Sequence, residues 1–190
     1  DLWSNFTYFL DDPIDGDQFK QKDKRTIFGG SYENIWIGGA QTFTEHRFGM
    51  DIRHDSIDKV GLYRSKDREI TGPIREDQVD ESSLSSFYEM SFDLKTDWRA
   101  VLGIRADAYK FKVKSKDYNQ TDDESDFILS PKASIAYALS ENNEMYFSYG
   151  KGFHSNDARG VITFKDPITG EKSSPADPLV KSTGFEWGIK

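Results

Sequence analysis

The sequence of 190 residues contains no cysteine, and only three of its residues are histidine. The absence of cysteine excludes disulfide bonds, thiolate catalysis and cysteine-ligated zinc. No apolar run approaches the roughly 18 to 20 residues of a transmembrane helix, which excludes that kind of membrane span. Basic residues are also too few, because a formal net charge of −8 opposes the clustered lysine and arginine that phosphate binding requires. We therefore expect no nucleic-acid partner.

Aromatic residues are the unusual feature that is present. They make up 14% of a chain whose hydrophobic residues total only 36% and whose mean hydropathy is −0.72. So many aromatic rings require an apolar environment, but the apolar content is low for a core that is covered on both sides. We therefore expect each structural element to have a single apolar face.

Strict alternation of apolar and polar residues is the strongest pattern in the sequence, and it predicts β-strands. Between positions 84 and 94 one face carries Leu84, Tyr88, Met90, Phe92 and Leu94, and the other face carries Ser85, Glu89, Ser91 and Asp93. The same alternation recurs in other segments, where the second face carries charges in the middle of the strand. These charged positions are Arg47, Asp51, Arg53, Glu89, Asp93, Arg99, Arg105 and Asp107.

Eight such strands are predicted, which makes the fold class all-β, an antiparallel up-and-down meander. Short connections such as 95–97 and 140–143 favour hairpins. They alternate along the chain with long polar connections at 11–23, 57–81, 115–126 and 154–181. The predicted strands are 3–10, 24–36, 44–56, 83–94, 97–113, 127–139, 143–153 and 182–190.

This sorting of the connections is typical of outer-membrane β-barrels, which have short turns at one end and long loops at the other. Trp36 and Trp98 lie beside short turns, where an aromatic girdle at the membrane interface is expected. The alternation by itself also fits a small closed barrel, or a soluble antiparallel sheet with one solvated face. These alternatives, with a binding or structural role, remain open at this point.

Three segments in order carry a resemblance to a known family: "LGIRADAYKF", then "LSPKASIAYALSENNEMYFSYGKGFHSNDARG", then "DPLVKSTGFEWGIK". In sequence and spacing they resemble consecutive barrel strands of the TonB-dependent outer-membrane receptors. The resemblance implies that residues 1–190 are a single segment, truncated at both ends, of a large barrel of about 22 strands. The family's plug domain and TonB-contacting box have no counterpart in these residues.

The resemblance also implies a function. Such a receptor takes up an external small-molecule ligand, of the siderophore, cobalamin or saccharide type, across the bacterial outer membrane with energy supplied by TonB. It is a transport protein and not an enzyme, and no cofactor is implied. Its expected partners are outer-membrane lipid, its own plug domain, TonB and the external ligand.

The segment "FHSNDARG" is the candidate functional site, with His154, Asn156, Asp157 and Arg159. On one interpretation these side chains contact ligand or plug at the mouth of the barrel. On the other they supply turn chemistry, with Arg159 paired locally. The charged positions in mid-strand similarly either face the lumen and hold a plug, or hydrate a solvated surface.

Chemistry beyond binding has little support. A catalytic pair of His154 and Asp157 is not favoured, because no nucleophile stands in a strand-turn-helix context. The acidic run at 122–126 lacks the glycine-centred spacing of a calcium loop. We therefore predict no catalytic residue and no metal site.

Overall fold

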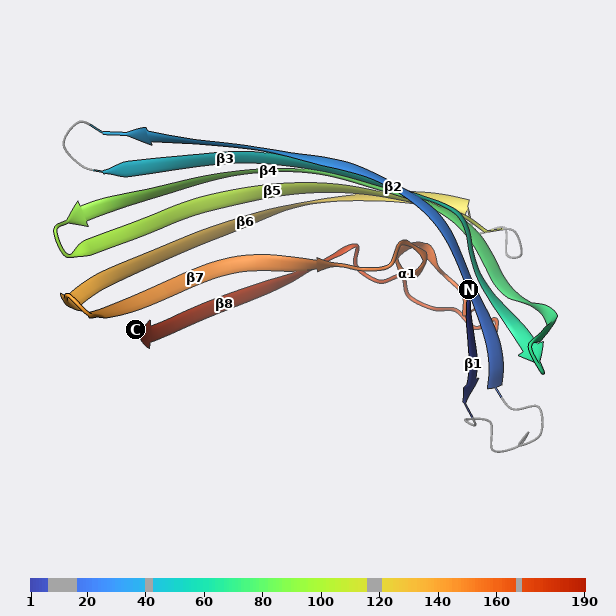
Figure 1. Ribbon diagram of the computed structural model, residues 1–190. Helices are drawn as coiled ribbons and strands as arrows, with labels where there is room; N and C mark the ends of the chain where they lie inside the picture. The colour runs from blue at the N-terminus through green and yellow to red at the C-terminus, as the bar shows by residue number, and fades with distance from the viewer. Residues whose placement is uncertain (7–16, 40–42, 116–120, 167–168) are drawn as a thin grey trace.

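A computed structural model describes residues 1–6, 17–39, 43–115, 121–166 and 169–190. They form one antiparallel sheet of eight strands, in which every strand pairs with its neighbours in chain order (Figure 1). This confirms the predicted all-β meander. The elements are β1 (Leu2–Phe6), β2 (Asp17–Gly38), β3 (Thr44–Lys66), β4 (Glu69–Lys95), β5 (Trp98–Ser115), β6 (Thr121–Ser140), β7 (Asn143–Ser155), α1 (Ala158–Ile162) and β8 (Leu179–Ile189).

The predicted long connection at 57–81 is wrong, because β3 and β4 run through it and meet at a turn of Asp67 and Arg68. Both turn residues have positive φ, 52° and 65°, which is the backbone of a tight two-residue hairpin. Because segment 57–81 is rich in polar residues, these parts of β3 and β4 were not predicted from the sequence. Register shifts between β3 and β4 accommodate its glycines and its proline. The polar segments 17–23 and 121–126 likewise belong to strands, β2 and β6.

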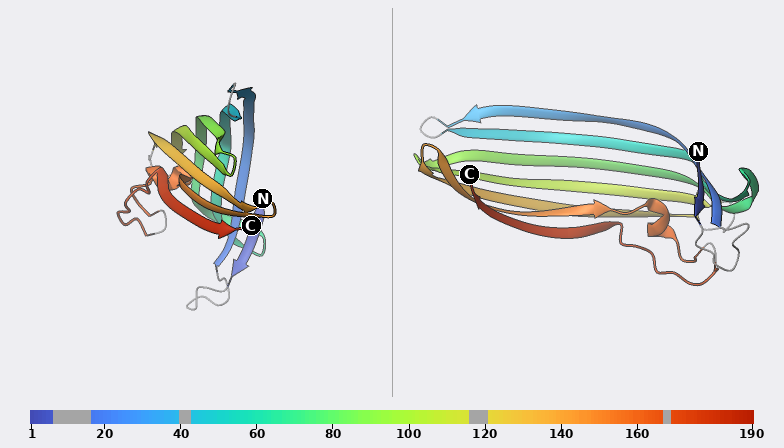
Figure 2. Two further views of the ribbon diagram at one scale, coloured as in Figure 1. Left: turned by 90° about the vertical axis from the view of Figure 1, so that its left-hand side faces the viewer. Right: turned by 60° about the horizontal axis from the view of Figure 1, so that its bottom comes forward.

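The sheet is strongly curved, and α1 lies on its concave side (Figures 1 and 2). The residues that pack against α1 identify the concave face of each strand. Val79 of β4 with Phe111 and Val113 of β5 form a buried cluster with residues of α1. Because side chains alternate along a strand, odd-numbered positions of these strands face the concave side and even-numbered positions face the convex side.

The convex face carries an exposed apolar band. On β5 the band runs from Trp98 to Ala108, about 33 Å at about 3.3 Å per residue, which becomes about 25 Å for strands tilted by about 40°. That height equals the apolar band of an outer-membrane barrel. At the end near the short turns Trp98 packs on Tyr137, with ring centroids 4.6 Å apart, and Trp36 stacks on His46 at 5.2 Å.

The two ends of the sheet differ in their connections. The turns at 96–97 and 141–142 lie at one end, beside the C-terminus (Figure 1). The β3–β4 turn lies at the other end, together with the connection from β7 to β8, which contains α1 and is called the α1 connection. Among the residues that the structure describes, there is no helix that is long and apolar enough to cross a membrane.

Candidate functional site

The connection from β7 to β8 folds onto the concave face of the sheet (Figures 1 and 2). Its helix α1 buries Ala158, Val161 and Ile162. These side chains pack against strand residues distant in sequence, namely Ile57, Val79, Phe111 and Val113. This helix was not predicted from the sequence, although a capping Asp157 followed by apolar residues four and five positions later is a helix signal.

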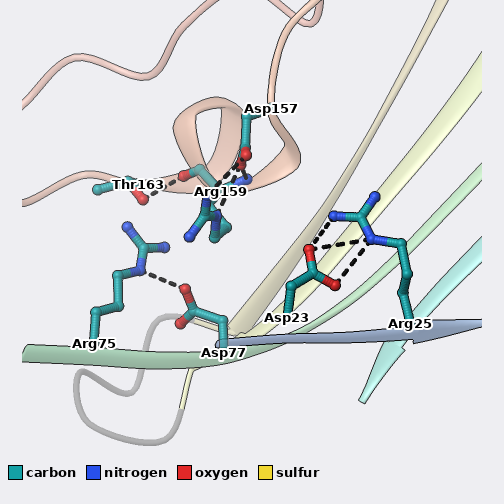
Figure 3. Close-up of polar contacts among 7 residues, drawn as sticks. All are labelled: Asp23, Arg25, Arg75, Asp77, Asp157, Arg159 and Thr163. Carbon is teal, nitrogen blue, oxygen red and sulfur yellow. Dashed lines mark hydrogen bonds and ion pairs between the residues drawn. The ribbon is translucent and has the colours of Figure 1, made fainter. Parts of the chain in front are cut away.

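Asp157 is the N-cap of α1. Its Oδ1 accepts a hydrogen bond from the Arg159 backbone nitrogen at 2.8 Å and one from Arg159 Nε at 3.0 Å. Its Oδ2 accepts from Arg159 Nη2 at 2.9 Å (Figure 3). The carboxylate therefore satisfies a free N–H group of the first helical turn and holds a guanidinium in a bidentate pair. These contacts are the turn chemistry that the sequence suggested as one of two roles.

Asn156 fastens the two ends of the connection to each other. Its backbone nitrogen donates to the Pro178 carbonyl at 3.0 Å, and its Nδ2 donates to the Asp177 carbonyl at 2.7 Å. His154 lies one residue from the end of β7, opposite Val180 in the register, and its side chain is exposed. In the part of the chain that the structure describes, His154 forms no side-chain hydrogen bond, so its imidazole is available to a ligand.

Arg159 stands among carboxylates from three elements. Besides Asp157 they are Asp23 of β2 and Asp77 of β4 (Figure 3). The hydrogen bond to Asp157 raises the pKa of Arg159 against the effect of burial, and the charges of Asp77 and Asp23 raise it further. Burial alone would raise the pKa of Asp157, but the hydrogen bonds and charge of Arg159 hold it below its ordinary value of 3.8.

This lowered pKa predicts that α1 loosens in acid. A carboxylate with a depressed pKa stabilises the folded state above its ordinary pKa, and this stabilisation is lost as the pH falls through the folded value. Amide protection factors of Gly160 and Val161, whose nitrogens bond to the Asp157 carbonyl, should therefore fall as the pH is lowered from about 5 through the depressed pKa of Asp157, which lies below 3.8. Asp157→Asn should abolish that step, and an unchanged step in the variant would contradict the assignment.

The eight charged positions predicted for one face lie mostly in local ion pairs. Arg105 Nε binds Asp107 Oδ1 at 2.9 Å, and its Nη1 reaches Asp51 Oδ2 at 3.1 Å. Asp93 stands opposite Arg99 in the β4–β5 register. The remaining contacts are Arg53 with Asp55 at 2.8 Å, Arg47 with Glu33 at 3.3 Å, Arg99 with Glu144 at 3.0 Å, and Glu89 with Lys132.

A spacing of two residues recurs in these pairs. In a strand such residues share a face, so each arginine can be neutralised by its own strand. These ion pairs were not predicted from the sequence, although their spacing is readable there as Arg-x-Asp or Asp-x-Arg. It occurs within strands at 23–25, 53–55, 75–77 and 105–107, and the same spacing stands at the N-terminus of α1 at 157–159.

A polar cavity lies on the concave face beside the end of β7. Arg53, Asp55, Glu81, Ser83 and Tyr109 are among its lining residues. The wall offers both hydrogen-bond donors and acceptors, a composition suited to binding a polar molecule. Among the described residues, no three histidine or acidic side chains are placed so that they could hold a metal ion.

The comparisons with known proteins agree with this geometry. The family model described as TonB dependent receptor-like, beta-barrel, matches residues 1–190. The ferric-pyoverdine BN7/BN8 receptor of Pseudomonas putida is 26% identical over 116 residues, which are 59% of this chain and 13% of that receptor. The chain therefore spans only a small part of this relative's length.

Solved structures show the same fold at low identity. The copper transporter OprC superposes with a TM-score of 0.68 at 13% identity, covering 93% of this chain and 29% of OprC. The unliganded ferric citrate transporter FecA gives 0.59 at 13% identity, covering 72% and 21%. The alcaligin outer-membrane receptor FauA of Bordetella pertussis gives 0.56 at 16% identity, covering 90% and 27%. The chain belongs to the family of TonB-dependent receptor-like β-barrels.

Proposed function

We propose that residues 1–190 are one segment of the barrel wall of a bacterial outer-membrane receptor that takes up an external ligand with energy from TonB. The observation that carries this proposal is the contrast between the two faces of the sheet. The convex face is an apolar band of membrane height, and the concave face carries paired charges. A soluble sheet would leave this large apolar surface in water, which favours the membrane barrel over the soluble alternative.

In this proposal the concave face lines the lumen and the short turns face the periplasm. The α1 connection then lies at the external mouth, where His154 and Arg159 are candidates for contact with ligand or plug. Asn156 and Asp157 serve mainly to shape the connection, since their polar groups bond within it. The charged side chains that face the lumen would meet a plug domain as ion pairs, in which each charge is already neutralised by its partner within the sheet.

The proposed ligand is a ferric siderophore. The support is the ferric-pyoverdine receptor among the relatives, with a ferric citrate transporter and an alcaligin receptor among the similar structures. The mixed donors and acceptors of the concave cavity are compatible with a polar chelate. Cobalamin and saccharides have no comparable observation in their favour.

Uptake by the intact receptor tests this proposal directly. Cells that produce the full-length receptor should accumulate iron-55 from a ferric pyoverdine-type siderophore, and cells lacking TonB should not. The matched control is a strain without the receptor gene, since other transporters can import the same complex. Equal accumulation with and without the receptor would refute the proposed transport, while accumulation without TonB would refute its energy source.

The proposed orientation predicts which end of the sheet is accessible from outside. Ser174 lies in the α1 connection and Glu141 in the β6–β7 turn, and both are exposed. These two connections lie at opposite ends of the sheet (Figure 1). In a cysteine-free full-length receptor, Ser174→Cys should react with a membrane-impermeant maleimide on whole cells. Glu141→Cys should react only after the outer membrane is permeabilised. The reverse pattern would invert the orientation, and labelling of both sites on whole cells would contradict membrane insertion.

A further inference from the structure

Asp77 of β4 has a half-satisfied carboxylate in a buried position. The residue is 1% exposed, and its Oδ2 accepts from Arg75 Nε at 2.5 Å. Its Oδ1 is buried and has no hydrogen-bond partner among the described residues. A buried acceptor without a partner loses the solvation it had in water and gains nothing in return. This oxygen is therefore a position at which a second donor would be stabilising.

Arg159 is placed to supply that donor. It extends from the first turn of α1 toward the same region as Arg75 and Asp77 (Figure 3). Its Nε and Nη2 bond to Asp157, but its Nη1 has no hydrogen bond to any described residue. Val79, two positions after Asp77 on the same face of β4, packs in the cluster that holds α1. The helix is thus already docked beside the unsatisfied oxygen.

We propose that Arg159 is a two-position latch for the α1 connection. In the observed arrangement it binds Asp157 and the cap of α1 is complete. In the second arrangement it donates to Oδ1 of Asp77, which draws the first turn toward β4 and weakens the cap. In the observed arrangement Arg159 bonds to Asp157 and leaves Oδ1 of Asp77 without a donor, so in this proposal the two carboxylates hold the guanidinium in turn, and their relative strength sets the position of the connection. The inference rests on the proposed function, in which this connection borders the route of the ligand.

The short length of α1 makes the latch effective. A helix of five residues has almost no stability of its own, so its first turn depends on the cap and on packing. The nitrogens of Gly160 and Val161 bond to the Asp157 carbonyl at 2.9 and 3.1 Å. Their exchange with solvent therefore reports how often Asp157 leaves its capping position.

Hydrogen exchange on the full-length receptor in detergent tests the latch. Asp77→Asn removes the competing charge, so exchange at Gly160 and Val161 should slow by about five-fold or more. The same substitution in an Arg159→Gln background should have no effect, because no guanidinium remains to be shared. Asp107→Asn is the matched control, since Asp107 is also 1% exposed but both of its carboxylate oxygens accept from Arg105, and it lies outside the α1 cluster.

The outcomes separate the latch from general destabilisation. If Asp77→Asn speeds exchange, or changes it equally with and without Arg159, the latch is overturned. If Asp107→Asn slows exchange as much as Asp77→Asn, the effect is not specific to the facing pair, which also overturns it. Iron uptake by the unmodified receptor is measured separately, so a failure of the proposed transport leaves the exchange result interpretable.

Discussion

Leu102→Arg is expected to destabilise the receptor in its membrane by about 2–4 kcal/mol, the cost of a cation near the middle of a barrel's lipid-facing surface. Leu102 lies on the convex face near mid-height of the apolar band, between Met90 and Ala133 in the register. Its side chain is 47% exposed and would contact lipid. The measurement is urea unfolding of the full-length receptor reconstituted in phospholipid vesicles.

Val101→Arg is the matched control, because Val101 is the preceding residue on the same strand and faces the concave side. Its opposite partner is Ser134, so an arginine there would enter a polar wall. We expect a change well under half of that at Leu102. Equal destabilisation by the two substitutions would mean that the convex face does not meet lipid.

Phe111→Ala is expected to cost about 3–5 kcal/mol, as deletions of buried aromatic side chains do. Phe111 is 0% exposed and belongs to the cluster that holds α1 on the concave face. It also stacks on Tyr109, with ring centroids 5.8 Å apart. Because the cavity would open directly beneath α1, the helix should detach before the barrel unfolds. Amide exchange of α1 should therefore rise much more than exchange in β5 at its membrane-level end.

Phe28→Ala provides the comparison, because Phe28 is an aromatic residue of another strand that is 67% exposed. Phe28 stands opposite His54 in the register and lies outside the cluster that holds α1, so its loss should leave the exchange of α1 unchanged. Both variants are compared by thermal unfolding and by α1 exchange in the same detergent. If Phe111→Ala leaves α1 exchange unchanged, the cluster does not hold the connection in place.

The faces of the strands were predictable from sequence, because they depend only on alternation. Leu102 and Arg105 differ in position by an odd number, so they must lie on opposite faces wherever the strand begins or ends. The ends of the strands were much less predictable. Asp67 and Arg68 adopt positive φ without glycine or asparagine, so no turn signal marked the place where β3 gives way to β4.

The candidate site was likewise predictable from the sequence only in part. A polar cluster after an aromatic strand correctly indicated where the chain leaves β7, but two roles for Asp157 were equally compatible with it. The contacts with Arg159 show that Asp157 caps α1, and that geometry exists only once the helix has formed. The helix in turn depends on Phe111 and Val79, which are tens of residues away along the chain.

The sequence by itself determined the all-β meander, the apolar and charged faces of its strands, and the resemblance to the family. Each of these follows from residue order within one strand or between neighbouring strands, which a period of two records directly. Only the tertiary structure decided the true length of β3 and β4, the inward fold of α1, and the carboxylates that surround Arg159. These depend on curvature and on packing between distant segments, because a curved sheet brings β2, β4 and α1 to one place on its concave face.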